Sequence, residues 1–267
     1  MLLYIEMVLI VKPYQRFGNN ILQMIHAIHI AETFGIRVIR FNFDHFTTNV
    51  LYVNSNTKSS LYKDVRIVDK FYYETNNLRL FPGLLPMTET DRNRIACTYL
   101  KPILKHVQPS SFLPDYENTL FVHIRSGDVF SEKIHAAYIQ PPVDYYRLIF
   151  SLEKSKQIVV IYEDEKNPVV NVLREQYPHI LFYTLPLLET ISVFLHAKYA
   201  AIGFGTFIPS ILSMNMNCEK VYSMKKYCPI PWKNSKCVYV RLPRYLTSWV
   251  NTEENRTAMV TYKGARV

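Results

Sequence analysis

The chain has 267 residues, of which 49% are hydrophobic and 20% are charged. This apolar share excludes a disordered chain, and the length allows two modest domains or one large α/β domain. Lysine and arginine outnumber aspartate and glutamate by 31 to 22, and the resulting formal charge of +9 favours an anionic partner such as nucleic acid, a phosphorylated small molecule or an anionic membrane surface.

The opening of the chain does not have the pattern of a targeting segment. The apolar run over residues 1–11 is short, is interrupted by Glu6, and lacks a basic n-region and a cleavage site. No later stretch reaches the roughly 20 apolar residues that a bilayer span needs. We therefore expect a cytoplasmic protein, with peripheral membrane contact left open. The four cysteines lack Cys-x-x-Cys spacing, so we interpret them as ordinary thiols rather than a disulfide frame or a zinc site.

A β-α-β unit is predicted at the start. Residues 7–11 form a continuous apolar run, as expected for a strand that is buried on both faces. A polar loop over 12–20 follows, and then apolar residues recur at helical spacing over 21–31 until Gly35 ends the helix. Residues 37–41 are predicted to form the second strand.

The middle of the chain divides it into two parts. Residues 44–86 are irregular in pattern and rich in Asn, Tyr and Thr, and a helix is predicted from 90 to about 106. Prolines and serines over 109–114 mark a domain boundary. We expect an N-terminal domain over 1–113 and a C-terminal domain with a crossover tail over 114–267.

The second half alternates regularly between strand and helix patterns. Strands are predicted at 119–124, 157–162, 180–183 and 200–204, and helices at 143–154, 169–176, 187–198 and 207–214. This alternation predicts a parallel sheet with helices on both faces, and thus an α/β fold class. Two such units in one chain indicate a cleft between them.

Three loops directly follow predicted strands, where open α/β sheets bind their ligands. The first is Arg-Phe-Gly-Asn-Asn at 16–20. Gly18 permits a tight turn, and Asn19 with Asn20 can cap the following helix while an amide points into the cleft. A helix cap alone is the alternative interpretation.

The second loop, over 123–130, contains an arginine at the carboxyl end of its strand. The guanidinium of Arg125 can bind a phosphate in a bidentate manner, which an ammonium cannot do. Gly127 allows close approach of the backbone, and Asp128 can hold Arg125 or cap the next segment. The alternative is that Arg125 and Asp128 form a salt bridge that only closes the loop.

The third loop is Gly-Phe-Gly-Thr-Phe at 203–207, at a strand-to-helix junction. Small residues and a hydroxyl at a helix start are typical of an anion site, because free N–H groups point outward there. The loop is neither the Gly-x-Gly-x-x-Gly fingerprint nor a Walker A loop, which disfavours dinucleotide binding and ATP hydrolysis.

Taken together, these loops resemble the motifs of the fucosyltransferase superfamily, which includes the α-1,2-, α-1,6- and protein O-fucosyltransferases. Residues 16–20 resemble the R-F-G-N-Q or G-L-G-N-Q signature, and 123–128 (His-Ile-Arg-Ser-Gly-Asp) resemble the H-x-R-R-G-D donor motif. Residues 162–165 are similar to the strand-end F-S-D-D, and 203–207 stand where these enzymes have N-S-S-F. The order and spacing of these matches cover most of residues 7–215.

The resemblance implies a GT-B architecture of two facing Rossmann-like domains, with 1–113 on the acceptor side and 114–267 binding the nucleotide sugar. It also implies an inverting, metal-independent enzyme that moves L-fucose from GDP-fucose to a glycan hydroxyl. By motif matching, Arg125 would bind the donor diphosphate and neutralise the departing GDP, and Asn19, next to Gly18, would face donor and acceptor. The remaining matched residues would shape the nucleotide pocket, brace Arg125 or contact phosphate; they are His123, Asp128, Asp164, Thr206 and Phe207. No separate cofactor is implied.

The sequence departs from the family pattern at two of these motifs. Ser126 replaces the second arginine of H-x-R-R-G-D, and Gly-Phe-Gly-Thr-Phe at 203–207 replaces N-S-S-F. The same scaffold could therefore use a rhamnose, xylose or galactose donor, or could be a non-catalytic nucleotide- or carbohydrate-binding module.

A general base for the acceptor hydroxyl needs a carboxylate or an imidazole within hydrogen-bond reach. Asp44 and His45, just after the second predicted strand, are the candidates, and surface exposure is the alternative for both. His26 and His29 lie one helical turn apart, but we expect no metal there. The acidic loop at 163–165 is interpreted as a strand end and not as a metal-binding D-x-D.

A nucleic-acid-binding function is the remaining alternative. It would rest on the basic stretch 225–244, where Tyr227, Trp232 and Tyr239 are interleaved with cations. Prolines and cysteines in the same stretch disfavour it, so we expect no nucleic-acid partner. We expect acceptor specificity in the loops of 44–86, and the sequence does not indicate an oligomeric state.

Overall fold

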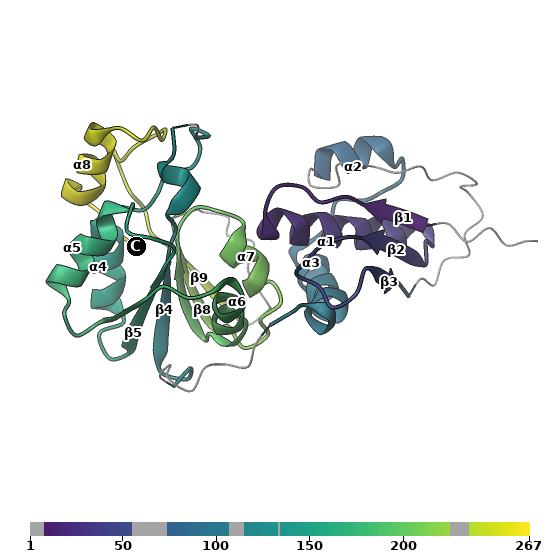
Figure 1. Ribbon diagram of the computed structural model, residues 1–267, viewed down its shortest axis with the longest axis horizontal. Coiled ribbons are helices and arrows are strands. Elements are labelled where there is room, and N and C mark those ends of the chain that lie inside the picture. Colours follow the sequence, from purple (N-terminus) through teal and green to yellow (C-terminus); the bar gives the residue numbers. More distant parts are fainter. Residues whose placement is uncertain (1–7, 55–73, 107–114, 133, 225–234) are drawn as a thin grey trace, which may run out of the picture. The chain divides into compact units, whose positions relative to one another are not determined.

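The computed structural model describes residues 8–54, 74–106, 115–132, 134–224 and 235–267 (Figure 1). Contacts divide the chain into two compact units, Met1–Lys105 and His106–Val267. The boundary predicted at 113 lies outside the described residues and stays a prediction. The expected facing arrangement of the two domains also stays a prediction.

The N-terminal unit contains the predicted β-α-β arrangement. Strands β1 (Val8–Val11) and β2 (Val38–Phe41) are parallel, and α1 (Phe17–Phe34) connects them. Gly35 ends the helix in the left-handed conformation, with φ of 73°. A third strand, β3 (Val50–Tyr52), pairs antiparallel with β2, which gives the order β1-β2-β3.

The burial of β1 differs from the prediction. Leu9 and Val11 are buried, but Ile10 between them is 37% exposed. The expectation of a strand buried on both faces is therefore wrong. The reason is that α1 packs on β1 and β2 from one face, so alternate side chains of β1 point away from it.

Short elements in the irregular stretch were not predicted. β3 and α2 (Glu74–Leu80) both lie within 44–86. The helix expected from 90 is confirmed: α3 (Glu89–Ile95) continues through a π turn over Ala96–Leu100 and a 3-10 turn over Lys101–Ile103. A bidentate bond from Arg94 to Glu32, with N···O distances of 2.8 and 2.6 Å, ties α3 to α1.

The C-terminal unit is a six-stranded, fully parallel sheet of order β6-β5-β4-β7-β8-β9. Counted along this unit, the order is 3-2-1-4-5-6, the strand order of a Rossmann fold. The α/β class and the parallel sheet are therefore confirmed. The strands are β4 (Thr119–Ile124), β5 (Gln157–Tyr162), β6 (Leu181–Tyr183), β7 (Tyr199–Ile202), β8 (Lys220–Ser223) and β9 (Lys236–Tyr239).

Helices cover both faces of this sheet, as predicted (Figure 1). α4 (Val143–Leu152), α5 (Pro168–Gln176) and α8 (Glu253–Thr261) contact one another, and so do α6 (Leu187–His196) and α7 (Phe207–Leu212). Because strand side chains alternate, Leu120, Val122 and Ile124 of β4 join the core under α4, α5 and α8. His123 points to the opposite face and meets Phe194 of α6.

The crossover expected of the tail stays a prediction, and the structure adds further elements to the tail. β8, β9 and α8 were not predicted, and α8 packs against α4 and α5 of its own unit. The tail is anchored there by Trp249, whose Nε1–H donates to the carbonyl of Val129 at 2.7 Å, and by Asn251, whose Nδ2 donates to Phe130 at 2.6 Å. The basic residues 225–234 lie outside the described residues. In the part of the chain that the structure describes, no helix combines the length and apolarity of a membrane span.

Candidate functional site

The strand order of the C-terminal unit creates a topological switch point between β4 and β7. The chain leaves β4 toward β5 on one side and leaves β7 toward β8 on the other, so the loops after these neighbouring strands diverge at the carboxyl edge. These are the second and third loops singled out in the sequence. A small cavity of about 20 Å³ lies between them, and its lining includes His123, Arg125, Glu163 and residues 203–205.

The guanidinium of Arg125 is held in place by both loops. Its Nη2 donates to the two carboxylate oxygens of Asp128 at 3.2 and 3.1 Å, and its Nη1 donates to the carbonyl of Phe204 at 3.4 Å. The ring of Tyr138 stacks on it, with 4.7 Å between Cζ and the ring centroid. Asp128 therefore braces Arg125 as expected, and the same contact is the loop-closing salt bridge of the alternative interpretation.

Gly205 allows the third loop to approach Arg125 closely. Its φ is +153°, and a Cβ built on it would lie 2.9 Å from Nη1 of Arg125. A side chain at this position would both strain the backbone and displace the guanidinium. The Gly-x-Gly pattern thus has a role that its sequence did not reveal, which is to make room for Arg125.

The loop that contains Arg125 is also tied to the loop after β5. The N–H of Ser126 donates to Oε2 of Glu163 at 3.0 Å, and the hydroxyl of Ser126 donates to Oδ1 of Asp164. Asn167 Nδ2 donates to the carbonyl of Arg125 at 2.9 Å. Ser126 is fully buried, so the residue that replaces the second family arginine is a hydrogen-bonded interior residue. Asp164, expected near the nucleotide, helps to hold this loop.

His123 forms part of the cavity wall. It is 5% exposed, and its ring packs edge-on against Phe194 and Phe207, with centroid distances of 6.0 and 5.8 Å. Burial, helped by the charge of Arg125, lowers the pKa of His123 to about 3, so the imidazole is neutral at physiological pH. Phe207 also lines the cavity, and Thr206 precedes it at the start of α7. The phosphate contacts proposed for these two residues stay predictions.

In the N-terminal unit, α1 begins at Phe17, so Gly18, Asn19 and Asn20 lie in its first turn. The interpretation of the Asn pair as a helix cap is therefore wrong, because the cap position belongs to Arg16. This earlier start follows from backbone bonds of Asn19 and Asn20 N–H to the Arg16 carbonyl, at 3.0 and 3.1 Å.

Amide side chains of this helix hold the loop that precedes it. Oδ1 of Asn20 accepts from the Tyr14 N–H at 2.7 Å, Nε2 of Gln23 donates to the Lys12 carbonyl at 2.7 Å, and Nδ2 of Asn19 donates to Oε1 of Gln15. Gln15 itself has a left-handed φ of 57°. Asn19 is thus a loop-positioning residue in this structure. No sequence motif marks the part played by Gln23.

The two candidate bases occupy different environments. Asp44 is exposed, whereas His45 is half-buried and its ring meets that of Phe17 edge-on at 5.0 Å. Burial lowers the pKa of His45, although the neighbouring Asp44 acts in the opposite direction. The structure therefore places His45 beside the 16–20 loop. His29, one of the two helix histidines considered for metal binding, forms a hydrogen bond through Nε2 with the Leu85 carbonyl at 2.9 Å.

Comparison with known proteins gave matches only among solved structures. No family model and no curated protein matches the chain. A crystal structure of POFUT1 in complex with GDP has 11% identity and a TM-score of 0.45, covering 82% of this chain and 98% of that one. Two structures of the E. coli heptosyltransferase WaaC also match, and each alignment covers 87% of this chain and 93% of that one. The structure with ADP-2-deoxy-2-fluoro heptose has 10% identity and a TM-score of 0.42, and the structure with ADP has 11% identity and a TM-score of 0.44.

Substitution of Gly205 by alanine should destabilise the C-terminal unit by about 1–3 kcal/mol, because it adds backbone strain and a clash with Arg125. Urea unfolding followed by tryptophan fluorescence measures this, since both tryptophans of the chain, Trp232 and Trp249, belong to that unit. Gly264→Ala is the control, because Gly264 lies in the same unit and has φ of +133°, whereas its added Cβ would lie no closer than 3.3 Å to another residue, at the Tyr262 hydroxyl. Equal stability of Gly205→Ala and wild type would contradict the close approach.

The buried imidazole should make stability depend on pH. His123 has a folded pKa of about 3 against an ordinary value of 6.5, so the unfolded chain binds more protons between these values. Its contribution is complete above pH 6.5 and is lost as the pH falls, by up to about 1.4 kcal/mol per pH unit. In urea titrations from pH 7 to 4, His123→Leu should lower this slope, whereas the exposed His135→Gln should not. If the change of stability with pH is the same in His123→Leu as in the wild type, His123 is not the buried imidazole responsible for it.

Proposed function

We propose that this protein is a glycosyltransferase that uses a nucleotide-sugar donor, whose diphosphate binds Arg125 at the switch point of the C-terminal unit. The observation that carries this proposal is the fixed guanidinium at the carboxyl edge of a sheet with Rossmann strand order. Ligands of such sheets bind in this crevice. A guanidinium is also the side chain best suited to a diphosphate, because its planar fork matches phosphate oxygens.

Arg125 would act on the leaving group. When the glycosidic bond to the donor phosphate breaks, negative charge develops on the departing nucleoside diphosphate, and a cation held in advance stabilises it without reorganisation. Asp128, Tyr138 and Gly205 supply this preorganisation by fixing the edge and the faces of the guanidinium. Charge neutralisation by an arginine supports a metal-independent reaction.

For the donor we favour GDP-fucose, on the basis of the motif resemblance at 16–20 and 123–128. A buried serine in place of the second family arginine removes one cation from this loop. This departure keeps rhamnose, xylose and galactose donors as the alternatives on the same scaffold. The acceptor would be a glycan hydroxyl, and we retain the cytoplasm as the expected compartment.

Deprotonation of the acceptor hydroxyl would fall to the loop after β2. His45 has a lowered pKa, so its imidazole is neutral at physiological pH and able to accept a proton. It also contacts Phe17 of the first loop, where the motif places the acceptor side. Asp44 remains the carboxylate candidate for the same role, and its exposure leaves it accessible to substrate.

A non-catalytic binding module is the second candidate. The observation that favours it is the departure from the family motifs, since a buried Ser126 replaces the second arginine and Gly-Phe-Gly-Thr-Phe at 203–207 replaces N-S-S-F. Both functions predict nucleotide binding, and only the first predicts transfer of the sugar to an acceptor or to water.

Donor choice is tested by thermal shift and calorimetry with GDP, UDP, dTDP and their sugars, with and without EDTA. GDP or GDP-fucose should stabilise the protein selectively, by about 2.7 kcal/mol at one hundred times Kd, and EDTA should change nothing. Selective stabilisation by UDP or dTDP would contradict GDP-fucose as the donor but not the proposed glycosyltransferase fold. Absence of stabilisation by every nucleotide would overturn the proposed function.

The role of Arg125 is tested by Arg125→Ala and Arg125→Lys. Both should weaken donor binding about 100-fold or more while the protein stays folded, because neither side chain can make the bidentate contact. Calorimetric Kd values are compared with those of Arg266→Ala, which removes an exposed arginine elsewhere in the unit. Wild-type donor affinity in folded Arg125→Ala would remove the diphosphate assignment.

A further inference from the structure

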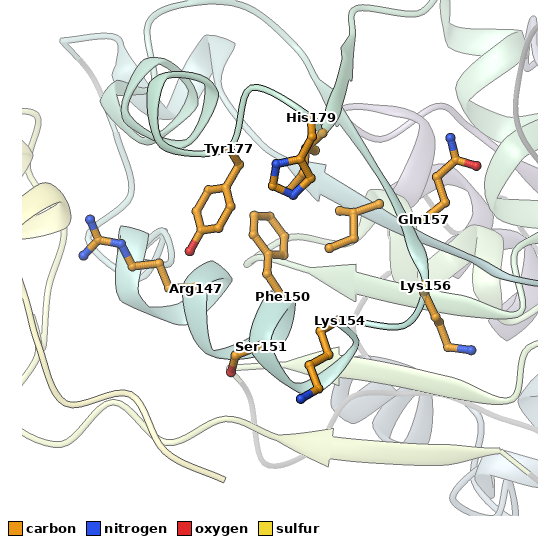
Figure 2. A pocket seen from close by; sticks show the side chains of 10 residues that line it. Arg147, Phe150, Ser151, Lys154, Lys156, Gln157, Tyr177 and His179 are labelled. Carbon is orange, nitrogen blue, oxygen red and sulfur yellow. The ribbon is translucent and has the colours of Figure 1, made fainter.

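A second cavity lies at the opposite, amino edge of the same sheet (Figure 2). It has a volume of about 340 Å³ and is formed by the end of α4, the turn into β5 and the segment between α5 and β6. This volume falls in the range of small-molecule pockets, about 300–1,000 Å³. The six residues of β5 separate it from the Arg125 loops, a distance of roughly 20 Å along the strand.

Aromatic rings form the centre of this cavity. Phe150 is 4% exposed, and the ring of Tyr177 meets it edge-on, at 5.2 Å between centroids and 89° between planes. The ring of His179 follows at 6.1 Å from that of Tyr177. Figure 2 shows these three rings grouped together. Such a surface binds a flat or apolar group by stacking.

Cations surround the rings. Arg147, Lys154 and Lys156 line the cavity, and Figure 2 shows their charged ends pointing outward from the aromatic centre. Arg147 donates through Nε and Nη2 to the neutral amide oxygen of Gln176, at 2.9 and 2.6 Å. Lys156 lies over the ring of Tyr199, with Nζ 3.5 Å from the centroid. Within the described ranges, none of the three has a carboxylate oxygen within 4.0 Å, and the lining has no acidic residue.

Several other cations of the same unit are paired with carboxylates. Ion pairs join Arg174 to Glu165 at 2.9 Å, Lys198 to Glu219 at 3.1 Å and Lys220 to Glu153 at 2.7 Å.

Glu153, close in sequence to the cavity lysines, is turned into the interior. It is 4% exposed, and the Tyr222 hydroxyl also donates to it, at 2.6 Å. Three cations without an ion pair to a carboxylate of the described residues, Arg147, Lys154 and Lys156, therefore line one cavity. An anion bound there would gain charge-assisted hydrogen bonds without displacing an existing ion pair.

We propose that this cavity is a second binding site, for a small organic anion of the phosphate-ester type whose flat group stacks on the aromatic centre. Arg147 and Lys154 bind the phosphate, and Tyr177 with His179 contacts the organic group. The site is separate from the Arg125 crevice and does not depend on the proposed glycosyl transfer.

Phenyl phosphate is the probe, and inorganic phosphate and phenol represent its two halves. In a titration followed by amide NMR shifts at low salt, phenyl phosphate should perturb the amides of 147–158 and 176–180. It should bind at least about tenfold more tightly than either half, because both parts of the cavity are used. Equal affinity for inorganic phosphate would overturn the aromatic contact. Shifts confined to 125–128 and 203–205 would overturn the second site.

Variants that each remove one positive charge test whether the cations lining the cavity bind the phosphate. Arg147→Gln and Lys154→Gln should each weaken phenyl phosphate about tenfold, the effect of losing one charge-assisted hydrogen bond. Lys263→Gln removes an exposed positive charge outside the cavity and should bind as the wild type does. Arg125→Ala should also keep this affinity, although donor binding is lost. Equal weakening by Lys263→Gln would show a general charge effect and refute the site.

Discussion

The candidate site depends on one guanidinium being fixed where three strand-end loops meet. Arg125 comes from the loop after β4. The loop after β7 supplies the Phe204 carbonyl that accepts from its Nη1, and the glycine that leaves room for the guanidinium. The loop after β5 holds the neighbouring backbone N–H of Ser126 through Glu163. None of these contacts is local in sequence except the pair with Asp128. The parallel sheet is therefore part of the site, because strand order and register decide which loops can reach Arg125.

The carboxylates around Arg125 favour selective binding at the crevice over nonspecific binding of any anion. Asp128, Glu163 and Asp164 all lie within the same loops, so the crevice has several carboxylates for its one central cation. Glu163 and Asp164 are bonded to Ser126, and Asp128 is bonded to the guanidinium. A ligand without a strong, correctly shaped anion would gain little there. The overall excess of positive charge lies elsewhere, including the opposite edge of the sheet.

Much of the fold could be predicted because local patterns of apolar residues determine many of its strands and helices. Continuous apolar runs gave β4 and β5, and helical periodicity gave α1 and α4–α6 with small errors at their ends. The same patterns placed Arg125 and Gly205 at strand ends. Long-range features were missed: α8 is fixed by burial of Met259 in a distant core, and Tyr138 reaches Arg125 through the fold with no motif to mark it. Ile10 was misjudged because apolarity alone does not reveal which face a helix covers.

The bonds from the tail to the segment after Asp128 have a consequence for how the protein is made. Trp249 and Asn251 hold the carbonyls of Val129 and Phe130, which lie about 120 residues earlier in the chain. On the ribosome, β4 and its loop emerge long before these two side chains exist. The Arg125 loop must therefore wait, without its final hydrogen bonds, until nearly all of the C-terminal unit has been synthesised. Completion of the crevice is a late event in the life of each new chain.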